Sequence, residues 1–147
     1  MGFGYAIVAL SMIWMLMTSS MTSVDASRVS EKQNAQDSTL LAGDMLRTAS
    51  AVNDWRYTRS LGDGAIDLTQ LSISPLPDPR IRASVSAGRL WIWTADQPGL
   101  RPALNQLSSG SALALAVTGG HLLMSDGTDM NLALPAGVSE GNVVYLN

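Results

Sequence analysis

Residues Ile81–Trp93 read IRASVSAGRLWIW, and they carry the strongest structural signal in the chain. The first half alternates apolar with polar side chains, which is typical of a strand with one buried face. Ala87-Gly88 then predicts a tight turn, so the whole stretch is expected to form a β-hairpin. Because Leu90–Trp93 is apolar at every position, its strand is expected to be covered on both faces.

Upstream of this hairpin, apolar side chains recur at helical spacing over residues 41–55 and form one stripe along a helix. A cap among residues 37–39 and a stop near Gly62 are expected to bound this amphipathic helix. We expect the stripe to pack on a sheet, with a coiled-coil seam as the alternative. The stripe consists of Leu41, Met45, Thr48, Val52 and Trp55.

The rest of the body predicts further strands and one short helix. Residues 66–73 are expected to form a strand or an extended run, and the prolines of residues 75–79 exclude a central strand there. A short helix is expected from Pro102. Further strands are predicted at residues 113–117, 121–124, 132–134 and 141–146. Residues 39–147 are therefore expected to form one α+β domain with a mostly antiparallel β-sheet.

The N-terminal segment, residues 1–24, contains no charged side chain; the first is Asp25. As a helix this segment would be about 36 Å long, enough for a hydrocarbon core of about 30 Å. We expect one transmembrane helix, and residues 25–38 as a polar tether that is either flexible or a helical continuation. A signal peptide cleaved after Ala26 and a buried core helix are the alternatives.

Two features of the sequence bear on which side of the membrane the domain lies, and they point in opposite directions. Arg28 and Lys32 follow the segment and, taken alone, favour a cytoplasmic domain. A domain of this size, however, translocates largely regardless of nearby charge. The chain after the N-terminal segment has a single lysine and many Ser, Thr and Gly residues, a composition that is common in exported bacterial domains. We therefore expect a single-pass inner-membrane protein with a periplasmic C-terminal domain.

Composition excludes several classes of protein. Of 147 residues, 46% are hydrophobic and 14% are charged, which excludes a disordered chain. With no cysteine there is no disulfide framework and no thiolate nucleophile, and a net charge of −3 offers no basic surface for nucleic acid.

Motifs with possible chemistry are weak. The lone His121 lies at a turn, residues 126–129 lack the closing Glu of a calcium loop, and residues 62–64 lack the third glycine of a dinucleotide site. We expect no enzyme activity and no catalytic, cofactor-binding or metal residues, and no cofactor or small-molecule ligand.

Trp91 and Trp93 are the one unusual pair, since residues two apart on a strand share a face. Burial under a covering element, which the helix of residues 41–55 could supply, is one interpretation. An aromatic patch for a protein partner is the other. In the second case Trp91, Trp93 and Arg82 are the candidate partner-interface residues.

The whole chain resembles the small PilM family of type IVb (thin) pilus biogenesis, known from conjugative-plasmid operons and distinct from the larger actin-like protein of that name. The resemblance lies in length, the hydrophobic N-terminus, Trp91-Ile92-Trp93 and the closing segment Leu134–Tyr145. It implies an inner-membrane component of the pilin transport machinery or basal body, with other type IV pilus assembly proteins as partners.

Two other functions stay open at this point. A minor-pilin-like subunit would also join an apolar helix to a sheet, although Ile7 stands where a major pilin has glutamate, counting from Phe3. A secreted binding or hydrolase domain would require cleavage of the N-terminal segment.

Overall fold

The computed structural model describes residues 3–110 and 113–147, and for residues 3–26 it describes the backbone alone. The chain divides into two units, Met1–Gln36 and Asp37–Asn147. In the first unit, residues 27–36 are helical with exposed side chains. The transmembrane prediction for residues 1–24 lies outside the residues whose side chains are described. Among the helices that are described with side chains, none is long and apolar enough to cross a membrane.

Residues 25–38 are helical, so the predicted helix start among residues 37–39 is wrong. They belong to α1, Phe3–Thr58, which also contains the predicted amphipathic helix. Two of the three expected cap residues, Asp37 and Ser38, have partners far along the chain. The Ser38 hydroxyl donates to the Pro98 carbonyl at 2.7 Å, and Asp37 accepts from Arg80. These side chains therefore join the middle of α1 to later parts of the chain.

The described residues of the second unit form a six-stranded sheet with the order β1-β2-β3-β6-β4-β5, antiparallel throughout. The predicted α+β class, with an antiparallel sheet and a helix, is confirmed. The elements after α1 are β1 (Gly64–Ile66), the 3₁₀ helix η1 (Leu68–Leu71), β2 (Arg82–Ser86), β3 (Arg89–Ala95), α2 (Leu100–Leu107), β4 (Ala114–Thr118), β5 (His121–Leu123) and β6 (Asn142–Leu146).

The predicted hairpin is confirmed as β2 and β3. Ser86 pairs with Arg89, and the two turn residues Ala87 and Gly88 both have positive φ, 51° and 74°. Two positive φ angles in a two-residue turn give the backbone twist that matches paired strands. Alanine tolerates this conformation less well than glycine, so the pairing of the flanking strands maintains it.

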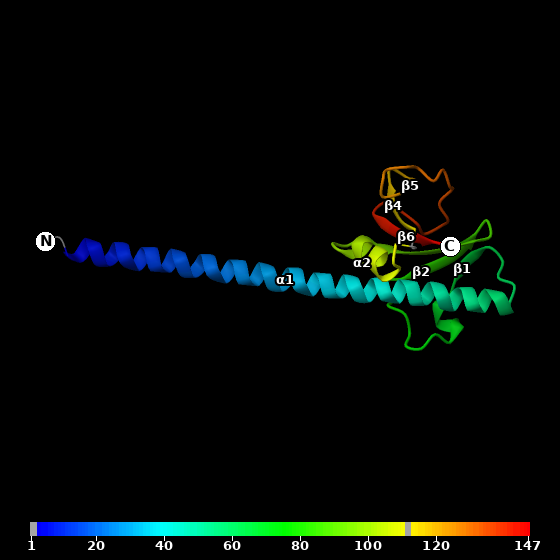
Figure 1. The fold of residues 1–147 in the computed structure, drawn as a ribbon, viewed down its shortest axis with the longest axis horizontal. Helices are drawn as coiled ribbons and strands as arrows, with labels where there is room; N and C mark the ends of the chain where they lie inside the picture. The colour runs from blue at the N-terminus through cyan, green and yellow to red at the C-terminus, as the bar shows by residue number, and fades with distance from the viewer. Residues whose placement is uncertain (1–2, 111–112) are drawn as a thin grey trace. The chain divides into compact units, whose positions relative to one another are not determined.

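Strand β3 separates two apolar cores, as its continuous hydrophobic run predicts. Leu90 and Ile92 face α1 and α2, while Trp91 and Trp93 face the opposite side, towards the chain between β5 and β6. Figure 1 shows the two helices on one side of the sheet in the second unit. The residues of α1 in the first core are Leu41, Ala42, Met45, Ala49 and Val52. The sheet-packing interpretation of the helical stripe is therefore confirmed.

Two predicted strands differ in the structure. Residues 68–71 form η1 because Asp67 caps it, its carboxylate accepting from the Thr69 backbone N–H at 3.0 Å. Residues 132–134 form no strand, although Leu132 and Leu134 pack against the second core. Apolar alternation therefore identified the buried side chains there but not the backbone conformation.

The start of α1 in the second unit is fixed by a cluster of charged side chains. Arg80 donates to both oxygens of Asp37, at 2.9 and 3.0 Å, and to both oxygens of Asp78, at 3.0 and 2.8 Å. Gln97 adds a hydrogen bond to Asp37 and another to Ser38. The hydrogen bonds from Arg80 and Gln97 lower the pKa of Asp37 to about 2. This cluster joins the helix to two separate loops.

Met45→Ala should lower the free energy of unfolding by about 2–5 kcal/mol, because Met45 is fully buried between α1 and the sheet. Leu40→Ala, on the same helix but 74% exposed, is the matched control and should change it by about 0.5 kcal/mol or less. Urea unfolding of the full-length protein, followed by tryptophan fluorescence, measures both. Equal effects of the two substitutions would contradict the packing described above.

Acid should weaken the attachment of α1 through Asp37. The pKa of Asp37 is lowered from 3.8 to about 2 in the folded protein, so its stabilising contribution is complete above pH 4 and is lost as the pH falls towards 2. Asp37→Asn should therefore flatten the decline of the urea midpoint over that range. Asp54→Asn, an exposed carboxylate of the same helix, is the control and should keep the wild-type slope.

Candidate functional site

Both tryptophans of the predicted interface are buried. Trp91 is 2% exposed and Trp93 is 6% exposed, and they pack with the apolar side chains of β4, β5 and β6. The burial favours the core interpretation, and the cover on this face is not the helix of residues 41–55, which lies on the other face. The folded domain thus presents no exposed aromatic patch at these two positions.

Arg82 and Trp93 nevertheless meet at one site. They pair directly across β2 and β3, so their side chains share a face of the sheet, and both line a groove of about 600 Å³. We call this the Arg82 groove; it is formed by residues 65–69, 76–79, 81–83, 93 and 136–137. Trp91 is not part of it. The groove lies across the ends of β1, β2 and β3, under the proline-containing connection.

The proline-containing connection is held against α1 by Asp44 and Arg47. The Asp78 backbone N–H donates to Asp44 at 2.9 Å, and Arg47 donates to the Pro75 carbonyl at 2.6 Å. Arg47 and Asp44 also form an ion pair. These contacts give the groove a fixed wall, from which Leu76 projects with 62% of its surface exposed. A large exposed apolar side chain beside a groove is typical of a contact surface.

Opposite this wall, Gly137 lies against the Trp93 ring. A Cβ atom at this position would stand 3.2 Å from Trp93 Cζ2, and Gly137 has a positive φ of 94°. Both observations favour glycine at this position. The close approach lets the backbone of residues 136–137 form one side of the Arg82 groove.

The carboxylates at the groove already have partners within the domain. The hydrogen bond from Arg80 lowers the pKa of Asp78, and the hydrogen bonds from Thr69 lower the pKa of Asp67. Arg82 is exposed, and within the described part of the chain its guanidinium has no hydrogen bond or ion pair. The groove therefore combines apolar walls with one arginine, Arg82, and two carboxylates, Asp67 and Asp78.

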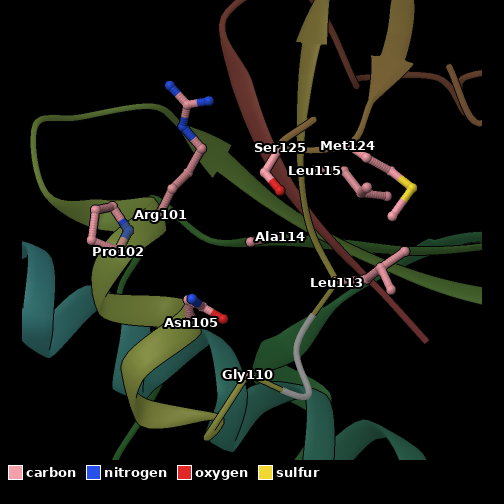
Figure 2. Close-up of a pocket in the computed structure, with 9 residues that line it drawn as sticks. All are labelled: Arg101, Pro102, Asn105, Gly110, Leu113, Ala114, Leu115, Met124 and Ser125. Atoms are coloured by element: carbon pink, nitrogen blue, oxygen red, sulfur yellow. The ribbon is translucent and has the colours of Figure 1, made fainter. Parts of the chain in front are cut away.

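A second pocket of about 640 Å³ lies between α2, β4 and the chain that follows β5. Figure 2 shows Arg101, Pro102 and Asn105 of α2 on one side, with Leu115 and Met124 on the other. Arg101 is paired with Asp96 at 3.2 Å. No sequence motif indicates this pocket, because its residues come from separate elements.

The polar motifs of the sequence occupy ordinary surface positions. His121 Nδ1 lies 2.9 Å from Asp129, and both side chains are exposed. Asp126 accepts from the Thr128 backbone N–H, which is the hydrogen bond of a simple turn. Among the residues described with side chains, 27–110 and 113–147, no three or more His, Cys, Asp or Glu residues form a group that could hold a metal ion.

Comparison with known proteins connects this fold to one family. The PilM family model matches residues 12–146. The chain belongs to the PilM family. This family is related to pilus biogenesis, so the resemblance seen in the sequence is confirmed.

Two solved structures are similar to this PilM-family chain. A PilM protein crystal structure from Escherichia coli B7A is 29% identical, with a TM-score of 0.67, over 78% of this chain and 94% of that chain. A PilM protein structure from Pseudomonas aeruginosa 2192 is 23% identical, with a TM-score of 0.43, over 74% of this chain and 92% of that one. Comparison with curated proteins finds no match.

Gly137→Ala should destabilise the domain more than Gly127→Ala. Both glycines have positive φ, 94° and 86°, so alanine is strained at either position, at a cost of about 1 kcal/mol. Only at Gly137 does the new methyl group also meet Trp93, which should add about 1 kcal/mol or more. Thermal unfolding of the two full-length variants measures the difference. If Gly127→Ala proved as costly, the contact with Trp93 would not be what requires glycine.

Proposed function

We propose that this PilM-family chain is a non-enzymatic, inner-membrane-anchored component of a type IV (thin) pilus assembly apparatus. It would belong to the pilin transport machinery or the basal body, with residues 1–24 as a single transmembrane helix and the C-terminal domain in the periplasm. The observation that carries the proposal is an uncharged N-terminal segment in a chain of a pilus-related family.

Physical arguments support the anchor and the non-enzymatic role. Residues 1–24 would be about 36 Å long as a helix, which exceeds the thickness of the hydrocarbon core. The described side chains line a groove and a second pocket, and both sites suit contact with a protein better than catalysis. A component that connects other proteins needs a folded domain and an anchor. Within the domain, α1 is joined to the loop before β2 by the bidentate Arg80–Asp37 pair.

Ile13→Lys should release the protein from membranes, because a lysine near the centre of a transmembrane helix costs about 2.5–3.5 kcal/mol on insertion. Sedimentation of cell membranes, with the protein detected in pellet and supernatant, measures the release. Ile13→Leu is the control and should stay in the pellet. Full retention of the lysine variant would contradict the anchor.

Deletion of the gene, with pili counted by electron microscopy and mating efficiency measured, tests the role in pilus assembly. The proposal predicts loss of thin pili and recovery by the wild-type chain. Protease treatment of spheroplasts in the same strain should digest the domain while the membrane is intact. A protected domain would place it in the cytoplasm, and a soluble chain beginning at Ser27 would replace the anchor with a cleaved signal peptide.

A further inference from the structure

We propose that the second pocket binds an extended segment of a partner polypeptide, which pairs with the open edge of β4 as an added strand. We call this site the β4-edge pocket. The inference goes beyond the proposed function, because it assigns a binding site and the backbone geometry of its ligand. The site is lined on α2 by Arg101, Pro102 and Asn105, on β4 by residues 113–115, and after β5 by Met124 and Ser125.

The register of the sheet shows which backbone groups of β4 face this pocket. Leu90 and Asn147 exchange two backbone hydrogen bonds, at 2.9 and 3.0 Å. Because the N–H and C=O groups of successive residues in a strand point to opposite sides, Val144 then directs its pair away from β3 and towards Leu115 of β4. The next residue along β4, Ala114, therefore directs its N–H and C=O away from β6, to the side on which β5 pairs.

Strand β5 covers only part of that side of β4. It pairs with residues 116–118. After Leu123 the chain leaves the sheet in a turn, in which the Met124 N–H donates to the Thr128 carbonyl at 2.8 Å. Within residues 3–110 and 113–147, no hydrogen bond reaches the N–H or C=O of Ala114 from this side. A backbone donor and a backbone acceptor therefore face the β4-edge pocket.

These two groups indicate the chemical class of the ligand. The main chain of another extended strand presents a C=O and an N–H at the spacing that a strand residue requires, and an added strand gains affinity from such pairing. Three residues of β4, 113–115, line the pocket and extend for about 10 Å. About three residues of the ligand therefore pair here, in line with β5.

The walls of the β4-edge pocket determine which side chains the ligand carries. Ala114 packs on the side of the first core, where α2 lies, whereas Leu115 and Met124 belong to the second core. Figure 2 shows Asn105 on the α2 side and Leu115 with Met124 on the other. Since residues opposite each other in paired strands share a face, the ligand residue opposite Ala114 faces α2. Its two neighbours face Leu115 and Met124, and we expect them to be apolar.

A peptide-binding experiment tests the inference. The probe is a random library of peptides of about ten residues, presented to the full-length protein in detergent. Selected peptides should share two apolar residues separated by one variable residue. N-methylation of the amide that donates to Ala114 should weaken binding by about tenfold or more, because the hydrogen bond is lost, whereas methylation of either neighbouring amide should not.

Substitution of Ala114 tests the pairing from the side of the protein. Ala114→Pro removes the N–H that faces the pocket but no hydrogen bond of the sheet, so it should weaken binding by about tenfold or more and keep the urea unfolding midpoint. Ala114→Gly retains the N–H and is the matched control, which should bind as the wild type does.

A second pair of variants keeps the test valid if Ala114→Pro does not fold. Asn105→Trp places a large ring at the pocket from an exposed position on α2, and it should block binding. Gln106→Trp, exposed on the same helix but outside the pocket lining, is the control and should leave binding unchanged.

Four results would overturn the inference. They are a library from which no peptide is selected, equal binding to folded Ala114→Pro or to Asn105→Trp, and a methylation series in which no single amide matters. The fourth is a dimer of the wild-type protein that Ala114→Pro abolishes, because the strand would then come from a second copy of this chain.

Discussion

The two-sided burial of β3 is the constraint on which the second unit depends. A strand with Leu90 and Ile92 on one face and Trp91 and Trp93 on the other is stable in water only when both faces are covered. The helices α1 and α2 cover the first face. The second face is covered by side chains of β4, β5 and β6 and of the connection before β6. The elements that follow β3 therefore pack on one of its two faces: α2 on the first, and β4, β5 and the connection before β6 on the second.

The groove is a consequence of the same arrangement. Trp93 is the last aromatic residue of β3, and it lies where the cover from residues 136–137 meets the proline-containing connection. Because prolines cannot continue the hydrogen-bonding ladder, this connection leaves the sheet and lies beside it instead of adding a strand. Apolar surface at the sheet end thus stays partly open. That openness, with an exposed Leu76, distinguishes this part of the surface from the closed second core.

Membership of the PilM family gives these features a biological setting. The similarity to the Escherichia coli B7A PilM structure covers 78% of this chain and 94% of that one, so most of this fold is shared with that structure. At the first residue of the second unit, Asp37 accepts hydrogen bonds from Arg80 and Gln97, which join α1 to two loops of the same unit.

The sequence by itself determined the hairpin, most of the helical stripe and the α+β class, because burial patterns with periods of two and about 3.6 residues are local properties. Trp55, at the end of the predicted stripe, lies outside both cores. Tertiary structure decided the rest. The last strand, β6, inserts between β3 and β4, and Asp37 pairs with Arg80 across 43 positions, so neither contact has a local signature. Residues 132–134 show alternation without a partner strand. The groove could not be predicted from the sequence either. Arg82 and Trp93 were both candidate residues, but only the pairing of β2 with β3 and the approach of the distant Gly137 bring them into one groove.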